Sequence, residues 1–356
     1  MPKESLCVKV PKIHGEKAII LANKLEIAKR ELEIQRNKNF IYIPLIRQPS
    51  KSELETLKEQ VLDCEILTYA FPERKKRVKT FVELLEDKLS PHLLVSLPRA
   101  IDLVGDIAII EIPPELDAYK RIIGEAILET HKNVRTVLAK AGAISGTYRL
   151  REFSVIAGEP KTETIHKEHG CQYYVDLAKA YFSPRLSYEH KRVASLIEEG
   201  ETVIDLFAGV GPFAIQIAKT HENVEVYAID VNPNAVEFLK RNIRLNRVEG
   251  KVHPILGDAK HVVKERLSGV ADRVIMNLPE KAIKFVEAAC KTLKPEGGIV
   301  HFYSFVDVSD SLENVKLRFI EAVEKSGRKV EKILFSRLVR ATAPYEWQVV
   351  LDAKIQ

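Results

Sequence analysis

The order of apolar and polar residues is most informative at residues 202–219, where an apolar run gives way to two glycines and then to an amphipathic segment. The run 203–207 predicts a buried strand, and Gly209 and Gly211 predict a sharp turn, because glycine adopts backbone conformations closed to other residues. Pro212 suits the first helical position, where a backbone amide would lack a partner. The stretch is therefore predicted to form a strand, a glycine turn and the start of a helix.

The same alternation continues through the C-terminal half of the chain. Strands are predicted at 203–207, 224–230, 252–256, 273–277 and 298–305, with helices at 212–219, 234–245, 259–267, 281–293 and 310–326. This alternation predicts a parallel sheet with right-handed crossovers. Two last strands, at 329–336 and 348–354, are joined by a loop too short for a crossover helix, so one of them is predicted to be antiparallel.

Two smaller α/β segments are predicted before this half. The first has strands at 5–10, near 32, near 41 and at 66–70, a hairpin turn at 37–39, and helices at 16–25 and 51–61. The second has strands at 93–97, 107–112 and 134–138, a helix at 114–130 and a hairpin at 169–170. The predicted organisation is an N-terminal domain (1–70), a basic linker (71–80), a middle domain (81–180) and the doubly wound domain (181–356).

The composition narrows the class of protein. The 356 residues are too many for one ordinary domain, and 46% hydrophobic residues suffice for large cores. There is no apolar run of 18 residues and no signal-peptide pattern, so neither a membrane span nor secretion is expected. The four scattered cysteines predict neither disulfides nor zinc binding and favour a cytoplasmic protein. A net charge of +5 is compatible with a nucleic-acid partner.

Acidic residues at successive predicted strand ends indicate a ligand site at one edge of the sheet, where open α/β sheets bind ligands. Asp230 suits the two ribose hydroxyls of NAD or of S-adenosylmethionine (AdoMet), and the glycine pattern fits both cofactors. Asp205, just before the turn, favours AdoMet over NAD. A carboxylate there would repel a pyrophosphate but attract ammonium and sulfonium groups.

Further cofactor contacts are predicted from the same strand ends. The backbone of Phe207, Ala208 and Gly209 is expected to lie along the amino-acid part of AdoMet. Asp258 is expected to bind the adenine amino group, and Ala259 to pack on the ring. The structural alternative for each acid is to cap the helix that follows it. Four more residues complete the predicted cofactor site: His190, Val231, Asn277 and Pro279.

Basic residues mark the predicted RNA contacts. Arg149 and Arg151 alternate with apolar residues after a glycine-rich stretch, so they are expected to share one strand face. The solvated side of an edge strand is the plain alternative to contact with phosphates or bases. The linker is interpreted either as a solvated connector or as a phosphate-binding segment. The predicted RNA-binding set is Arg74, Lys75, Lys76, Arg77, Arg149, Arg151 and Arg185.

The segment Asn277-Leu278-Pro279-Glu280 is the predicted catalytic loop. A strand that ends in asparagine, followed by a proline that cannot donate a hydrogen bond, leaves the amide and backbone carbonyls free to hold a planar base. A plain strand-to-helix turn is the alternative. The N-x-P spacing is typical of enzymes that methylate ring or exocyclic nitrogens.

Four motifs together make the chain resemble a known family: YRLRE at 148–152, YFSPRL at 181–186, DLFAGVGPF at 205–213 and NLP at 277–279. The combination is similar to the archaeal tRNA (guanine-37-N1)-methyltransferases over nearly the whole chain. The resemblance implies a class I AdoMet-dependent methyltransferase domain, Rossmann-like with a mostly parallel seven-stranded sheet, behind two smaller α/β domains. It also implies AdoMet as the cofactor and tRNA as the partner, bound at its anticodon loop and elbow by a monomer without a metal.

The resemblance implies roles for four residues. Arg149 would stabilise the negative charge that develops on guanine O6, and Tyr181 would pack on the everted base. Glu189, in the first turn of a helix predicted from Ser183 to about residue 198, would take the N1 proton. Asn277 would hold the base against the methyl group. The chemistry requires such groups, because neutral guanine N1 carries a proton and the base must leave its stack.

Glu280 departs from the family pattern, in which lysine is frequent after Asn-x-Pro. An acid there is more similar to bifunctional members that also methylate C7 of 4-demethylwyosine to give isowyosine. A bifunctional enzyme is therefore the expectation, with a monofunctional guanine-37-N1 methyltransferase as the alternative. An NAD-dependent oxidoreductase, a non-catalytic RNA-binding protein and a ribosomal RNA methyltransferase stay open as further alternatives.

Overall fold

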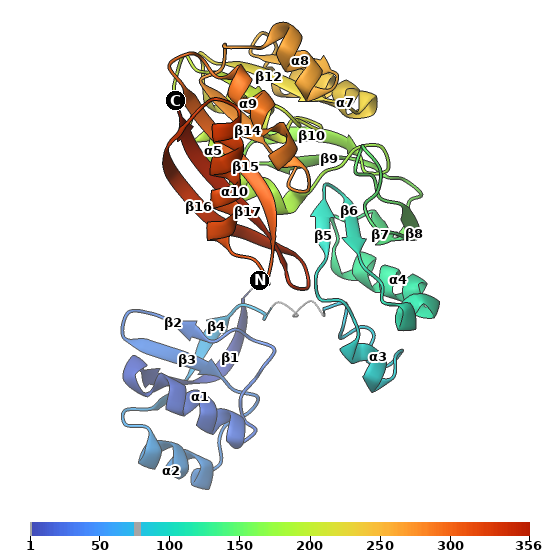
Figure 1. Ribbon diagram of the computed structural model, residues 1–356. Coiled ribbons are helices and arrows are strands. Elements are labelled where there is room, and N and C mark those ends of the chain that lie inside the picture. The colour runs from blue at the N-terminus through green and yellow to red at the C-terminus, as the bar shows by residue number, and fades with distance from the viewer. Residues whose placement is uncertain (1, 75–79) are drawn as a thin grey trace. The chain divides into compact units, whose positions relative to one another are not determined.

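The computed structural model describes residues 2–74 and 80–356, and the chain divides into two compact units, residues 1–78 and 79–356 (Figure 1). Lys75, Lys76 and Arg77, which are predicted to bind RNA, lie outside the described residues. The predicted domain boundaries at 70, 80 and 180 stay predictions. Within the described ranges, no helix combines the length and apolar character needed to cross a membrane.

The first unit is a four-stranded antiparallel sheet with two helices. Its strands are β1 Lys3–Pro11, β2 Gln35–Arg36, β3 Phe40–Pro44 and β4 Glu65–Phe71, in the order β2-β3-β1-β4. The short η1 Lys12–His14 leads into α1 Gly15–Lys24, and α2 Lys51–Gln60 follows β3. The helices and the sheet share a core of Val8, Val10, Leu21, Ile27, Ile43, Leu45 and Leu57.

Two local signals in this unit act as their residue types predict. Asn37 Oδ1 accepts hydrogen bonds from Asn39 N at 2.9 Å and Phe40 N at 2.8 Å, which forms the predicted hairpin turn between β2 and β3. Ser50 caps α2 by accepting from Glu53 N, while the Glu53 carboxylate accepts from Ser50 N. The predicted hairpin and second helix are thus confirmed.

The second unit starts with a four-stranded sheet of order β5-β6-β7-β8. Its elements are α3 Pro91–Val95, β5 Asp102–Val104, β6 Ile107–Ile110, η2 Pro114–Tyr119, α4 Lys120–Thr130, β7 Thr136–Lys140 and β8 Phe153–Gly158. The strand predicted at 93–97 is wrong, because this segment is helical. Pro91 takes the first helical position after Ser90, and Leu93 alone of the five residues is fully buried. A short apolar run does not distinguish a strand from a helix that buries one side.

The expectation that Arg149 and Arg151 share a strand face is also wrong. The chain turns here, with a bridge between Ser145 and Leu150, and β8 begins only at Phe153. Arg149 itself has a φ of 56°, in the left-handed region that side chains other than glycine rarely adopt. Residues at alternate positions lie on the same face only in an extended strand. Because Arg149 lies in a turn, its spacing from Arg151 does not place the two side chains on one face.

A hairpin of β9 Glu163–Glu168 and β10 Cys171–Asp176 follows, and its turn lies at His169 and Gly170 as predicted.

The rest of the chain forms a seven-stranded sheet of order β13-β12-β11-β14-β15-β17-β16. Its strands are β11 Thr202–Asp205, β12 Glu225–Asp230, β13 Val252–Leu256, β14 Arg273–Met276, β15 Gly298–Asp307, β16 Val330–Ala343 and β17 Glu346–Ile355. The first five are parallel, whereas β17 is antiparallel to both β15 and β16, which confirms the predicted final hairpin.

Helices cover both faces of this sheet (Figure 1). The helices α5 Ser187–Ala194, α6 Pro212–Thr220 and α7 Pro233–Asn246 pack on one face, and α8 Ala259–Arg266, α9 Val286–Thr292 and α10 Leu312–Lys325 on the other. The turns η3 Pro184–Leu186 and η4 Ala282–Phe285 precede α5 and α9. The first core also includes Val104, Ile107 and Leu138, so one face of the four-stranded sheet packs in the same core as the seven-stranded sheet, while a separate core covers its other face.

Two asparagines on α7 fix the β9–β10 hairpin to this core. Asn242 Oδ1 accepts from Tyr174 N at 2.7 Å, and its amide donates to Tyr174 O and Val210 O, both at 3.0 Å. One turn later, Asn246 Oδ1 accepts from Gln172 N at 2.8 Å and its amide donates to Gln172 O at 2.6 Å. Both side chains are buried, so they supply the hydrogen bonds that a neighbouring strand would give β10.

We expect Asn242→Ala to destabilise the second unit by about 2–4 kcal/mol, because it leaves backbone groups of Tyr174 and Val210 buried without partners. The free energy of unfolding in urea measures this loss. Asn234→Ala, an exposed position on the same helix, is the matched control and should unfold like the unaltered protein. Equal stability of the two variants would contradict the anchoring role.

Candidate functional site

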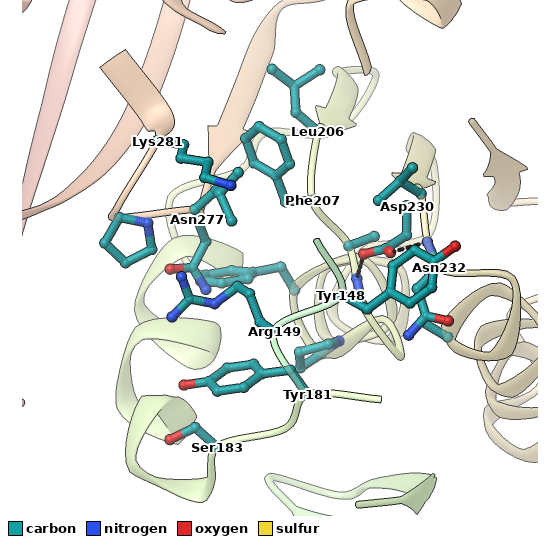
Figure 2. Close-up of a pocket in the computed structure, with 18 of the residues that line it drawn as sticks. Tyr148, Arg149, Tyr181, Ser183, Leu206, Phe207, Asp230, Asn232, Asn277 and Lys281 are labelled. Carbon is teal, nitrogen blue, oxygen red and sulfur yellow. Dashed lines mark hydrogen bonds between the residues drawn. The ribbon is translucent and has the colours of Figure 1, made fainter. Parts of the chain in front are cut away.

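The strand order places a crevice at the carboxyl end of β11. The chain moves outward from β11 to β12 on one side and from β14 to β15 on the other, and ligands of open α/β sheets bind at such a switch. A cavity opens there, and the residues after β11, β12 and β14 line it (Figure 2). It brings together most of the predicted site: Arg149, Tyr181, His190, Phe207, Ala208, Gly209, Asp230, Val231, Asp258, Ala259, Asn277 and Pro279.

The glycine turn and Asp230 form one hydrogen-bonded unit at the floor of this cavity. Asp230 Oδ2 accepts from Gly209 N at 2.7 Å, and its Oδ1 accepts from Asn232 N at 2.8 Å (Figure 2). Burial raises the pKa of Asp230, against the effect of these backbone hydrogen bonds. Carboxylate oxygens accept more than one hydrogen bond each, so Asp230 keeps capacity for two vicinal hydroxyls.

Asp205 lies beneath this unit and does not line the cavity. Its Oδ1 accepts from Phe207 N at 3.2 Å, while Oδ2 has no hydrogen-bond partner among the described residues. Burial, together with the nearby Asp230, raises the pKa of Asp205 to about 7. A buried acceptor of this kind, beside a second carboxylate, favours a ligand that carries positive charge.

Asp258 has the structural role that the sequence left open as an alternative. Its Oδ1 accepts from Lys260 N at 2.9 Å and His261 N at 3.2 Å, and so caps α8. It also lines the cavity beside Ala259. The cap and a ligand contact are compatible, because the hydrogen bonds recorded for the cap use one carboxylate oxygen.

Asn277 is held from behind by the final hairpin. Gln348 Nε2 donates to Asn277 Oδ1 at 3.2 Å, and Arg340 Nε donates to Gln348 Oε1 at 2.9 Å. Arg340 also donates to Ser183 Oγ at 2.8 Å and to Tyr181 Oη at 3.3 Å. These contacts leave the Asn277 amide nitrogen without a hydrogen bond among the described residues. No motif marked Gln348 or Arg340, and their roles follow only from the pairing of β16 with β17.

Arg149 and Tyr181 lie at the mouth of the cavity (Figure 2). The Arg149 guanidinium lies 5.4 Å from the centre of the Tyr181 ring. Its Nη1 is 2.7 Å from Glu280 Oε1, yet the pair is not aligned as a hydrogen bond, and Nη1 is buried with its donor unfilled among the described residues. An arginine donor in this state is prepared to bind an acceptor on a ligand.

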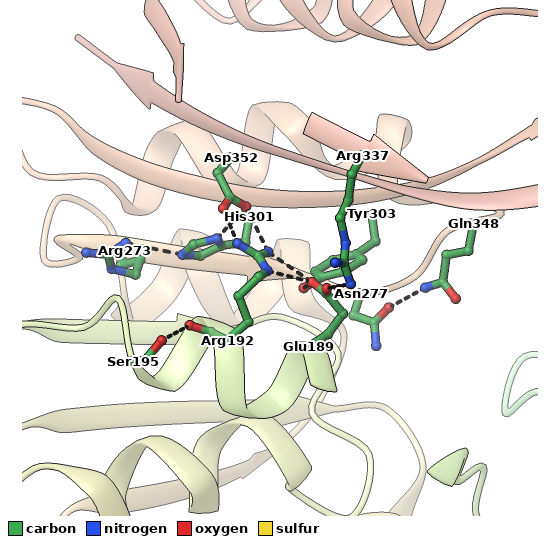
Figure 3. Close-up of polar contacts among 10 residues, drawn as sticks. All are labelled: Glu189, Arg192, Ser195, Arg273, Asn277, His301, Tyr303, Arg337, Gln348 and Asp352. Atoms are coloured by element: carbon green, nitrogen blue, oxygen red, sulfur yellow. Dashed lines mark hydrogen bonds and ion pairs between the residues drawn. The ribbon is translucent and has the colours of Figure 1, made fainter. Parts of the chain in front are cut away.

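Glu189 lies behind the cavity rather than in its wall. It is 1% exposed and accepts from Tyr303 Oη at 2.9 Å, Arg192 Nε at 2.9 Å and Arg337 Nη2 at 2.8 Å (Figure 3). Arg192 is fixed in turn by Asp352. Burial acts to raise the pKa of Asp352, but His301 and Arg192 outweigh it and lower the pKa to about 2.

His190, the neighbour of Glu189, does face the cavity. Its ring meets Phe213 edge-on at 4.7 Å, and its Nδ1 lies 2.6 Å from Glu168 Oε1. Burial acts to raise the pKa of Glu168, but His166 and His190 lower it to about 2. The sequence did not mark Glu168, which comes from the hairpin strand β9 and orients the His190 ring.

The remaining predicted arginines occupy other places. Arg151 and Arg185 line a second cavity that adjoins the first and shares Arg149, Tyr181 and Glu280 with it. Lys140 and Arg340 add to its positive charge, while Arg185 Nε donates to Asp102 Oδ1 at 2.5 Å. Arg74 is exposed in the first unit. Among the described residues, no group of three or more His, Cys, Asp and Glu side chains is placed to hold a metal ion.

Three family models match consecutive parts of the chain. They are the tRNA methyltransferase 5 N-terminal domain at residues 7–53, the TYW2 N-terminal domain at 81–162 and the TRM5/TYW2 methyltransferase domain at 164–333. The chain is 40% identical to the tRNA (guanine(37)-N(1))-methyltransferase Trm5b of Pyrococcus abyssi over 99% of both chains. It is 36% identical to the tRNA 4-demethylwyosine(37)-methyltransferase Taw21 of Saccharolobus solfataricus over 78% of this chain and 99% of that one.

Solved structures show the same likeness. The crystal structure of Pyrococcus abyssi Trm5b has a TM-score of 0.74 and 38% identity, with 99% of each chain covered. The complex of aTrm5 and tRNALeu has a TM-score of 0.73 and 34% identity, over 99% of this chain and 100% of that one. The Methanocaldococcus jannaschii TYW2 complex with AdoMet has a TM-score of 0.56 and 33% identity, over 72% of this chain and 99% of that one.

The raised pKa of Asp205 predicts a pH-dependent stability of the protein without bound ligand. Between its ordinary value of 3.8 and about 7, the folded state keeps a proton that the unfolded state has lost, so stability falls as the pH rises through this window. The free energy of unfolding falls by at most about 4 kcal/mol across this window.

Asp205→Asn removes this titration, so its melting temperature should fall less between pH 5 and pH 8 than that of the unaltered protein. Thermal unfolding followed by circular dichroism across this range measures the difference. Asp87→Asn, at an exposed position, should behave like the unaltered protein. Parallel pH profiles for the Asp205 variant and the unaltered protein would show that Asp205 is already ionised in the fold.

Proposed function

We propose that this chain, which belongs to the TRM5/TYW2 methyltransferase family, transfers a methyl group to N1 of guanine 37 in tRNA. The observation that supports this most directly is the cavity at the end of β11, which joins a cation-favouring floor to Arg149, Tyr181 and Asn277 at its mouth. The Trm5b of Pyrococcus abyssi, whose name specifies this reaction, is 40% identical to this chain, and the match covers 99% of both chains.

S-adenosylmethionine is the methyl donor, in keeping with the AdoMet complex of the TYW2 relative. When bound, it supplies a methyl group activated by positively charged sulfur. We assign Asp230 to the ribose hydroxyls, the backbone of 207–209 to the amino-acid part and Ala259 to the adenine, and this assignment is supported by their position in the lining of the cavity. Asp205, buried beneath Asp230, would add negative charge close to the positive charge of the ligand without lining the cavity. The glycine pattern alone is also compatible with NAD. The chain belongs to a methyltransferase family, however, so AdoMet and not NAD is the expected cofactor.

The guanine base would be handled by the three groups at the mouth. Tyr181 offers a ring for the everted base to stack on, and its hydroxyl is held by Arg340 at 3.3 Å. The unfilled Arg149 donor would bind O6, where negative charge develops as N1 loses its proton. Asn277, fixed by Gln348, would keep the base against the methyl group.

Glu189 is our proposal for the group that takes the N1 proton. In the structure its carboxylate is occupied by Tyr303, Arg192 and Arg337, so a partner must move away before the proton arrives. In the transfer the N1–H proton goes to Glu189, the new N1–methyl bond forms, and sulfur leaves as a neutral thioether.

The RNA contacts are proposed from charge. Arg151 and Arg185, with Lys140, line the second cavity next to the target pocket, where a flanking phosphate would be placed. Arg74 in the first unit is exposed and available for phosphate contact. Recognition of the tRNA elbow by the first unit, and action as a monomer, stay part of this proposal.

A second candidate activity is methylation of C7 of 4-demethylwyosine. It is supported by the Taw21 relative, whose name specifies that base, and by the seclusion of Glu189. A carbon acceptor needs no proton removed before attack, so a base behind the cavity wall is no obstacle to it. The two activities would use the same cofactor site.

We expect Arg149→Ala to slow single-turnover methylation of G37 by about 10²–10³-fold, because a positioned donor to the developing oxyanion is lost. The assay is incubation of unmodified tRNA transcripts with AdoMet, followed by nuclease digestion and mass spectrometry of the nucleosides. Binding of AdoMet, followed by calorimetry, should not change. Arg318→Ala on the surface of α10 is the control. An unchanged rate in Arg149→Ala would show that Arg149 takes no part in the reaction. If the unaltered protein formed no 1-methylguanosine, the proposed function would be refuted.

Glu189→Gln separates the two candidate reactions. Transfer to N1 of guanine should fall by about 10²-fold or more, whereas transfer to C7 of 4-demethylwyosine should stay within about threefold of the unaltered protein. The same assay is run on tRNA with guanosine or 4-demethylwyosine at position 37, and retained C7 transfer also shows that the variant folds. Equal losses on both substrates would contradict this division, and no C7 product from the unaltered protein would remove the second activity.

A further inference from the structure

Glu280 differs from the other acidic side chains of the cavity in what holds it. Three acids line the cavity among the described residues: Asp230, Asp258 and Glu280. Backbone amides occupy Asp230 and Asp258, as described above. Glu280 makes no such bond, its side chain is 44% exposed, and its recorded polar contact is the ion pair with Arg149. Apart from this ion pair, its carboxylate oxygens are therefore open to a donor on an arriving base.

Two elements far apart in sequence bring a donor and an acceptor together at this point. Arg149 comes from the turn before β8, and Glu280 from the loop after β14. The distance from Arg149 Nη1 to Glu280 Oε1 is 2.7 Å, but the guanidinium donor is not aligned with the carboxylate. Both side chains line the two adjoining cavities. The pair thus places one donor and one acceptor side by side at the junction of the two cavities, with Glu280 the more exposed of the two.

The Watson–Crick edge of guanine has the complementary pattern. It carries the acceptor O6 on one side of N1 and the donating amino group N2 on the other. A flipped base is commonly selected by hydrogen bonds to this edge. A donor and an acceptor that flank N1 leave N1 itself open to the methyl group, whereas a single group on N1 would block the attack.

We propose that Glu280 is a specificity-determining residue that accepts a hydrogen bond from the guanine N2 amino group, while Arg149 donates to O6. This inference rests on the proposed function of the cavity and adds the means by which guanine is selected. The arriving base separates the ion pair, and each partner exchanges the other for an atom of the guanine edge. Each charged group stays hydrogen-bonded, because it gains a partner on the base as it loses the other member of the pair.

The arrangement selects against other purines for stated reasons. Adenine places an amino donor where guanine has O6, so it would face the Arg149 donor with a donor of its own. Hypoxanthine keeps O6 and N1–H but lacks the amino group, so it tests Glu280 alone. A site built to hydrogen-bond an amino group disfavours the analogue without it, because its own acceptor is left unpaired.

The test uses the full chain, AdoMet and tRNA transcripts that carry guanosine or inosine at position 37. Single-turnover methylation is measured for the unaltered protein, Glu280→Ala, Glu280→Gln and Glu287→Ala. Glu287 is the matched control, since its carboxylate pairs with Lys291 on α9 at the surface and does not line the cavity. AdoMet binding by calorimetry checks that each variant keeps the cofactor site.

We expect the unaltered protein and Glu287→Ala to prefer guanosine over inosine by about tenfold or more. Glu280→Ala should lose most of this preference, to within about threefold, chiefly by slower transfer to guanosine. Glu280→Gln should keep much of it, because the amide oxygen still accepts from N2. A loss of structure would be recognised separately, because the variant would then fail to bind AdoMet in the calorimetry.

An unchanged guanosine-to-inosine ratio in Glu280→Ala would overturn the inference, even if both rates fell. Failure of the unaltered protein to methylate either transcript would instead refute the proposed function, and this inference with it. The two failures are distinguishable, because the first requires an active parent protein.

Discussion

The site depends on the hydrogen bond from Gly209 N to Asp230 Oδ2, at 2.7 Å, because this bond ties the turn after β11 to the end of β12. The turn can form because Gly209 and Gly211 have φ values of 55° and 93°. At Gly211 a Cβ atom would lie 2.3 Å from the Leu239 side chain, so the glycine also lets α7 pack closely. The bond keeps Asp230 buried next to Asp205, and this proximity of two carboxylates makes the floor of the cavity favour a cation.

The final hairpin is the second support of the site, and it acts from the far end of the chain (Figure 1). Because β17 inserts between β15 and β16, its Gln348 reaches Asn277, and Arg340 of β16 reaches Tyr181. Arg337 of the same strand reaches Glu189 (Figure 3). The residues that motifs identify are therefore held in place by residues that no motif marks. The antiparallel pairing serves to position the chemistry as well as to complete the sheet.

The parts of the fold that the sequence predicts are those whose signals are local. The strand, glycine turn and helix of 202–219, the turn at Asn37 and the antiparallel end of the sheet each depend on neighbouring residues, and each is confirmed. The helix α3 and the turn at Arg149 were mispredicted, because a five-residue apolar run and an alternation of two arginines fit more than one conformation. The burial of Glu189 could not be predicted, since Tyr303 and Arg337 lie 114 and 148 residues further along the chain.

The two glutamates nearest the chemistry differ in what holds them, and this difference decides how each can act. Glu280 is exposed to the cavity and paired with one arginine, so a base can reach it directly. Glu189 is enclosed by three donors, so in the proposed reaction a proton would reach it only after one donor withdraws. Arg192 is 10% exposed and fixed by Asp352, while Arg337 is 34% exposed and lies against the exposed ring of Tyr188 at 4.5 Å.

Arg337 is consequently the partner that leaves more readily, because it is more exposed to water, whereas Arg192 is also held by the buried Asp352. Release of Glu189 therefore runs through the edge strand β16, the same strand whose Arg340 holds Tyr181 at the mouth of the cavity. One edge strand thus holds both the tyrosine at the mouth of the cavity and the carboxylate behind it.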